Sequence, residues 1–265
     1  MANKKAVFLD IDGTLIRAPK GPFPDDVDAI KEAREDGHKF FINTGRSFAN
    51  VPQHIRSLDY FDGIICGAGS HVIIGGKTIY HKWIESEVLF EVCDFYAKRK
   101  NWCFLEGETN LFTINKMDFS LMLVDPILVK SKDDFKTKYK DELITKLSIA
   151  GSRDGQGSKR GVLSDEELEF LSRDFNVNVF DEYSEALIKG ESKSKGIKIA
   201  SDHFGLEQKD TVAMGDSMND FDMVKYAGIG VAMGNACQQL KEIADFVTLN
   251  CGEGGVAHAI KKFVL

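Results

Sequence analysis

The chain has 265 residues, of which 43% are hydrophobic and 28% charged, a composition typical of a globular protein with one large or two modest domains. The net charge of −7 and the lack of a basic block argue against nucleic-acid and membrane-surface binding. No apolar run approaches the roughly 20 residues that span a bilayer. No signal peptide is visible, so we expect a cytoplasmic protein. Five scattered cysteines without C-x-x-C spacing argue against a zinc cluster or a disulfide framework.

Both ends of the chain alternate short apolar strands with helices. The N-terminal third contains predicted strands at 6–9, 40–42 and 64–66 and predicted helices at about 25–36 and 47–58. The C-terminal third contains predicted helices at about 195–204, 219–226 and 254–263 and predicted strands at 212–214, 229–232 and near 246–248. Continuous apolar strands between helices indicate a parallel sheet that is covered on both faces. We therefore expect an α/β fold with a Rossmann-like, doubly wound parallel sheet.

The middle of the chain has a different pattern. From about 84 to 186 the alternation gives way to helices and pairs of short strands, and Ser164 and Glu167 form a capping box at the start of one helix. This pattern predicts an α+β module that is inserted between two halves of one sheet. We place the core at 1–83 and 190–265 and the inserted domain at 84–189.

The strands of the predicted core end in polar residues. The first strand is followed by Asp10 and Asp12, the second by Asn43-Thr44-Gly45-Arg46, and a later one by Gly215-Asp216-Ser217-Met218-Asn219-Asp220. Ligands of open parallel sheets bind at the carboxyl ends of the strands, so these groups meet at one edge. Four carboxylates at one edge require a cation, and ligands that are all oxygen favour Mg²⁺ over zinc.

The same edge can hold a phosphate group. Thr44, Lys195 and the backbone N–H groups around Gly13 and Gly45 are suited to bind phosphate oxygens. One carboxylate can attack phosphorus and form an aspartyl phosphate. A second carboxylate two residues further on points the same way in an extended chain, and it can protonate the leaving oxygen and later activate water.

Four motifs in this order resemble those of the haloacid dehalogenase-like superfamily. They are Asp-x-Asp-Gly-Thr-Leu at 10–15, Thr-Gly-Arg at 44–46, Lys195-Gly196, and Gly-Asp-x-x-Asn-Asp at 215–220. The resemblance is closest to the Cof-type phosphatases, whose large α/β cap lies between the second and third motifs. It covers the whole chain, although only the two core segments carry motifs.

The resemblance implies a role for each matching residue. Asp10 would be the nucleophile and Asp12 the general acid/base. Mg²⁺ would bind Asp10, Asp216 and the backbone carbonyl of Asp12, and Asp220 would support the metal shell. The phosphoryl group would be bound by Thr44, Gly45, Lys195 and Asn219. An acid at position 12 points to a phosphatase or phosphomutase, and the family implies small phosphorylated metabolites as substrates.

Several alternatives remain open at this point. Lys193 lies near Lys195 and is the alternative third-motif lysine; Arg46 is either a surface residue or a partner of the aspartates. Gly67-Ala68-Gly69 lacks a dinucleotide fingerprint around it. The polar loops at 106–110, 152–155 (with Arg153) and 181–184 are candidates to contact the substrate. The alternative functions are a phosphotransferase or phosphomutase of the same superfamily and a non-catalytic phosphometabolite-binding regulator, and the expected state is a monomer or homodimer.

Overall fold

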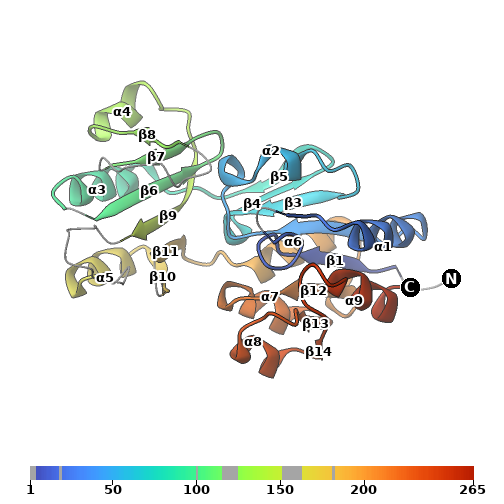
Figure 1. Ribbon diagram of the computed structural model, residues 1–265. Helices are drawn as coiled ribbons and strands as arrows, with labels where there is room; N and C mark the ends of the chain where they lie inside the picture. The colour runs from blue at the N-terminus through green and yellow to red at the C-terminus, as the bar shows by residue number, and fades with distance from the viewer. Residues whose placement is uncertain (1–3, 18–19, 100, 115–124, 151–162, 181–182) are drawn as a thin grey trace. The chain divides into compact units, whose positions relative to one another are not determined.

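The structure is a computed structural model, which describes residues 4–17, 20–99, 101–114, 125–150, 163–180 and 183–265. The chain divides into two compact units, and each contains one sheet (Figure 1). The first unit consists of Met1–Gly45, Gln53–His81 and Ser192–Leu265, and the second of Arg46–Pro52 and Lys82–Glu191. The domain limits at 84–189 stay a prediction. In the described ranges, no helix combines the length and apolar composition needed to cross a bilayer.

An eight-stranded sheet forms the centre of the first unit, with β1 (Ala6–Leu9) among its inner strands. The strands in spatial order are β14 (Phe246–Val247), β13 (Ile229–Ala232), β12 (Thr211–Gly215), β1, β2 (Lys39–Asn43), β3 (Gly63–Cys66), β4 (His71–Ile74) and β5 (Lys77–His81). β14 to β3 are parallel. Leu9 pairs with both Met214 and Ile42, so the carboxyl ends of β12, β1 and β2 lie level with one another.

Helices cover this sheet because its strands are apolar on both faces. They are α1 (Pro24–Glu35), α2 (Gln53–Arg56), α6 (Lys193–His203), α7 (Phe221–Tyr226), α8 (Gln238–Ile243) and α9 (Gly255–Phe263). Ile197 of α6 and Met223 of α7 pack with Phe8 in one core cluster. α1 and α9 lie side by side (Figure 1), and buried Asp26 accepts a 2.8 Å hydrogen bond from the N–H of Ala257. The predicted doubly wound α/β fold is confirmed.

One element differs from the sequence prediction. The helix expected at 47–58 is a short 3-10 turn, Phe48–Asn50, followed by α2, because Pro52 has no N–H with which to continue a helix. The sheet also continues into two antiparallel strands, β4 and β5. They are joined by Gly75 and Gly76, whose φ values of +55° and +76° suit a tight hairpin turn.

The second unit contains a six-stranded sheet with helices packed on one face. Its strands in spatial order are β10 (Phe175–Val179), β11 (Tyr183–Ile188), β9 (Ile144–Ala150), β6 (Trp102–Gly107), β7 (Leu111–Thr113) and β8 (Ile127–Leu128). Its helices are α3 (Ser86–Tyr96), α4 (Lys132–Thr137) and α5 (Asp165–Ser172), and α5 begins at the capping box of Ser164 and Glu167. Loop 152–155 with Arg153, and residues 181–182 of the third candidate loop, lie outside the described residues.

A buried ion cluster joins three strands of the second unit. Lys146 of β9 lies 2.5 Å from Glu185 of β11 and 3.5 Å from Glu106 of β6. Glu106 also accepts hydrogen bonds from the hydroxyl of Ser148 at 2.6 Å and from the N–H of Ser47 at 3.3 Å. Burial raises the pKa of Glu106, but Lys146 and these hydrogen bonds outweigh it, so the pKa lies below its ordinary value.

We expect Glu106→Gln to lower the free energy of unfolding by about 1–3 kcal/mol at pH 7. Because the folded-state pKa is depressed, the carboxylate stabilises the fold above its unfolded pKa of about 4.3. This stabilisation disappears as the pH falls through the folded-state pKa. Urea unfolding at pH 7 and pH 3 measures it, with the exposed Glu169→Gln on α5 as the matched control. An equal loss at both pH values would contradict the account.

Candidate functional site

The chain turns back sharply after β1 and presents Asp10 at the end of the strand. The N–H of Asp10 donates to the carbonyl of Met214 at 3.1 Å, and the Asp10 carbonyl accepts from the N–H of Leu15 at 3.2 Å. Gly13, with a φ of +81°, lies so close to Asp216 that a methyl group there would overlap its carboxylate. Glycine is therefore required at this position, since it permits both the conformation and the approach.

A second pair of carboxylates lies beyond β12. The carboxylate of Asp220 accepts hydrogen bonds from the N–H groups of Asp216 at 2.9 Å and Ser217 at 3.1 Å. These bonds shape the loop that leads from β12 into α7 and place Asp216 at the strand end. Asp220 is completely buried, while Asp216 is partly exposed.

One lysine joins the first strand to this loop. The Nζ of Lys193 lies 2.7 Å from Asp10 and 2.5 Å from Asp220, and only 1% of the residue is exposed. Lys193 is the first residue of α6, which Ser192 caps by accepting from the N–H of Lys195 at 3.2 Å. The amide of Asn43 donates to the Lys193 carbonyl at 3.1 Å, so the main chain of Lys193 is also held.

The lysine at the aspartates is therefore Lys193, the alternative that the sequence left open, and not Lys195. Lys195 instead donates to the hydroxyl of Tyr80 at 2.8 Å and lies 4.8 Å from the centre of its ring. Residues two apart on a helix point about 200° away from each other, so only one of these lysines can face the strand ends. The Lys-Gly pattern alone did not identify which one does.

Three carboxylates form a cluster that can hold a metal ion. One oxygen from each of Asp10, Asp216 and Asp220 lies within 4.8 Å of the others. In the part of the chain that the structure describes, the buried Oδ1 of Asp216 has no hydrogen-bond partner. A buried, unpartnered carboxylate oxygen beside two others is a donor set suited to a hard cation. The side chain of Asp12 is exposed and outside this cluster.

The charges of the cluster are unbalanced. Burial, together with Asp220, raises the pKa of both Asp10 and Asp216 to about 7, although Lys193 opposes the rise in each case. Burial tends to lower the pKa of Lys193, but Asp10 and Asp220 outweigh it and hold that pKa above its ordinary value. A protonated Lys193 thus stabilises carboxylates that it cannot fully neutralise, and a bound cation would supply the missing positive charge.

The other predicted residues lie at or near the same strand ends. Thr44 is buried directly after β2, and Gly45 follows it at the limit of the first unit. Asn219 lies in the loop after β12, where its side-chain oxygen accepts from the hydroxyl of Ser217 at 2.8 Å. Arg46 belongs to the second unit and donates to the carbonyl of Asn50 at 3.1 Å.

Asn235 was missed at the sequence level. It follows β13, and its amide donates to the carbonyl of Gly13 at 2.9 Å and approaches Asp216 at 3.5 Å. Its side-chain oxygen accepts from the N–H of Cys251 at 2.7 Å. The rule that ligands gather at strand ends, applied also to β13, would have selected this residue.

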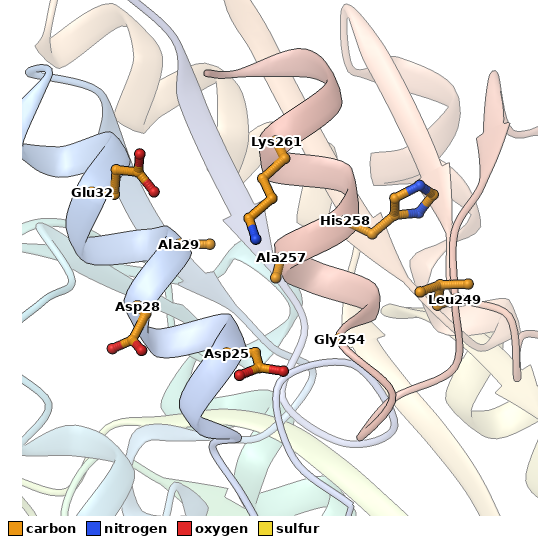
Figure 2. Close-up of a pocket in the computed structure, with 9 residues that line it drawn as sticks. All are labelled: Asp25, Asp28, Ala29, Glu32, Leu249, Gly254, Ala257, His258 and Lys261. Carbon is orange, nitrogen blue, oxygen red and sulfur yellow. The ribbon is translucent and has the colours of Figure 1, made fainter.

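A groove of about 360 Å³ between α1 and α9 is unsuited to phosphate (Figure 2). The carboxylates of Asp25, Asp28 and Glu32 line it along α1. Lys261 and His258 of α9 lie on its opposite wall. This excess of negative charge would repel a phosphate ester. The strand ends around Asp10 are therefore the candidate functional site.

Comparison with known proteins identifies the family. The family model for haloacid dehalogenase-like hydrolases matches residues 7–260, and the chain belongs to that family. It is 28% identical to the phosphatase YwpJ of Bacillus subtilis, over 98% of this chain and 100% of that protein. It is also 28% identical to the 5-amino-6-(5-phospho-D-ribitylamino)uracil phosphatase YcsE of Bacillus subtilis, over 98% and 96% of the two chains.

A solved structure shows the same architecture. The subclass IIB sugar phosphatase BT4131 is 27% identical with a TM-score of 0.81, and the match covers 99% of this chain and 100% of that one. The predicted family, with its Cof-type branch, is confirmed. The predicted enzyme class is confirmed as well, since the family model and these relatives define a hydrolase of the phosphatase type.

The two lysines should differ in their effect on stability. Lys193→Met leaves buried carboxylates without their ammonium partner, so we expect a loss of about 3 kcal/mol in the free energy of unfolding. Lys195→Met removes a contact with one tyrosine, and we expect a loss of about 1 kcal/mol. Urea unfolding at pH 7 without divalent cations measures both. A larger loss for Lys195→Met would contradict the placement of Lys193.

Proposed function

We propose that the protein hydrolyses small phosphomonoesters with Mg²⁺ as cofactor, through an aspartyl phosphate on Asp10. The observation that carries this proposal is the position of Lys193 between Asp10 and Asp220. In the described part of the chain, the buried Oδ1 of Asp216 in the same cluster has no hydrogen-bond partner. These groups combine a nucleophilic carboxylate, a fixed positive charge and a cation site at one edge of the sheet.

Two displacements at phosphorus make up the reaction. A carboxylate oxygen of Asp10 attacks phosphorus, the bond from phosphorus to the ester oxygen breaks, and Asp12 gives its proton to the leaving alcohol. Water then attacks phosphorus, its proton passes to the Asp12 carboxylate, and the bond between Asp10 and phosphorus breaks. The products are the alcohol and inorganic phosphate, and both side chains return to their starting states.

The remaining residues bind the phosphoryl group and the cofactor. Thr44, the N–H of Gly45, Lys193 and Asn219 would bind phosphoryl oxygens, with Lys193 taking the role first assigned to Lys195. Asp10, Asp216 and the backbone carbonyl of Asp12 would hold Mg²⁺, with Asp220 in support. When bound, the cation supplies positive charge that reduces the repulsion between Asp10 and an anionic ester.

The substrates are proposed to be small phosphorylated metabolites such as sugar phosphates, nucleotides or phosphorylated cofactors. This proposal is supported by two relatives, one a sugar phosphatase and the other a phosphatase for a phosphorylated ribitylaminouracil. The cytoplasmic location and the monomeric or homodimeric state stay predictions.

A screen of phosphorylated metabolites tests the proposed reaction. We expect the wild-type protein to release inorganic phosphate with Mg²⁺ and without an added acceptor, which separates a phosphatase from a phosphotransferase. Asp10→Asn should lower the rate at least about 10³-fold, since removing a nucleophile leaves only binding and electrostatic effects. Full activity in this variant, or undiminished activity in excess chelator, would refute the mechanism.

Mg²⁺ binding can be measured without activity. At a concentration of 100 times its Kd, Mg²⁺ should stabilise the fold by about 2.7 kcal/mol and raise Tm by roughly 5 to 10 °C. Asp216→Asn should abolish this shift, while the exposed Asp59→Asn, outside the cluster, should retain it. Differential scanning calorimetry at matched ionic strength gives the result. An unchanged shift in Asp216→Asn would place the cation elsewhere.

A further inference from the structure

The turn Gly67–Gly69 after β3 has an unusual backbone. Ala68 has φ +52° and ψ +44°, and among the described residues it is the one non-glycine residue with positive φ. An L-residue is disfavoured in this left-handed conformation, and such conformations persist where the surroundings fix them, often next to functional sites. All three residues of the turn are buried in the first unit.

One side of the turn holds Thr44, which directly follows β2. The N–H of Ala68 donates to the Thr44 carbonyl at 3.1 Å, and the N–H of Thr44 donates to the Ile65 carbonyl at 2.9 Å. The main chain of Thr44 is therefore bound on both sides by residues of β3 and of the turn that follows it.

The other side of the turn lies directly against the start of α6. A methyl group on Gly69 would overlap the carbonyl of Ser192, which leaves no space for any side chain at position 69. A methyl group on Gly196 would overlap the side chain of Ile65 and lie 3.3 Å from the Cα of Gly69. The main chain of the first turn of α6 thus packs directly against the main chain of the turn Gly67–Gly69.

We propose that the turn Gly67–Gly69 is a positioning element for the candidate active site. Ser192, which it touches, immediately precedes Lys193, and Thr44 is bound by the same turn. It thereby sets the starting point of α6, and with it the position of Lys193 relative to Asp10. The inference rests on the proposed function, because it assigns the turn to the phosphate-binding groups of that reaction.

Two other contacts fix the same part of α6 from different directions. Asn43 donates to the carbonyl of Lys193, and the carboxylate of Asp222 accepts from the N–H of Ser194 at 2.9 Å. With the turn, they hold three consecutive residues at the start of α6. Displacement of a catalytic or binding group by about 1 Å can reduce a rate 10²-fold. Contacts that fix the start of α6 therefore also protect the rate, because they keep Lys193 in place.

The first experiment is a double-mutant cycle between Gly69→Ala and Lys193→Met. The probe is inorganic phosphate, titrated by calorimetry with Mg²⁺ present. We expect Gly69→Ala to weaken phosphate binding at least tenfold, but to have less than a twofold effect in the Lys193→Met background. If Gly69→Ala weakens phosphate binding by the same factor in both backgrounds, Gly69 does not act through Lys193, and the inference is overturned. Gly76→Ala is the matched control, because its φ of +76° is similar and its Cβ meets no atom within 4 Å.

A second pair of variants separates positioning from loss of stability. Gly196 does not have a positive φ, so its backbone conformation is compatible with alanine. Gly196→Ala should therefore weaken phosphate binding through the overlap of its methyl group with Ile65. Adding Ile65→Ala creates the missing space but also a core cavity. We therefore expect the double variant to melt at a lower temperature than Gly196→Ala yet to bind phosphate more tightly. Affinity that falls with Tm in both variants would overturn the inference.

The wild-type protein distinguishes failure of the inference from failure of the function. If it neither releases phosphate from any ester nor binds inorganic phosphate, the proposed function fails and the inference fails with it. If the wild type is active and Gly69→Ala binds phosphate as Gly76→Ala does, the inference alone fails.

Discussion

The burial of like charges governs the arrangement around the strand ends. Asp10, Asp216 and Asp220 bring carboxylate oxygens within 4.8 Å of one another. Such a group is unstable away from water unless opposite charge or N–H donors compensate it. Lys193 provides the one ammonium of the cluster, and backbone N–H groups bind Asp220. The uncompensated negative charge that remains makes this edge suited to a cation.

The fold brings these charged side chains together because its main-chain segments approach one another, and the carboxylates, very closely. Gly13 lies against the Asp216 carboxylate, and Gly215 lies so near Asp220 that a methyl group would overlap its side chain. Gly69 and Gly196 allow α6 to approach the neighbouring strand in the same way. Glycines thus surround the charged residues. The carboxylates and the lysine come from different elements, and these elements must approach one another closely for the charged groups to meet.

Much of this organisation could be predicted from the order of polar residues along the chain. Parallel strands end at one edge, so placing Asp10 and Asp216 after apolar strands was enough to predict that they would meet. The choice between Lys193 and Lys195 could not be made in this way, because a spacing of two residues does not fix the rotation of a helix. The role of Gly67–Gly69 was equally hidden, since its partner Ser192 lies more than a hundred residues further along the chain. The helix predicted at 47–58 overlooked Pro52, a helix-breaking residue that separates the 3-10 turn from α2.

The order of the strands also has a consequence for how the chain acquires its chemistry during synthesis. β1 has β2 on one side, which follows soon after it, and β12 on the other, which comes only after the whole second unit. A nascent chain that ends within the second unit therefore contains Asp10 but lacks Lys193, Asp216 and Asp220. Pairing of β1 with β12 must wait for this distant segment, and distant pairings form slowly. Until α6 and the loop after β12 have been synthesised, the candidate nucleophile therefore lacks the charged residues that surround it in the folded structure.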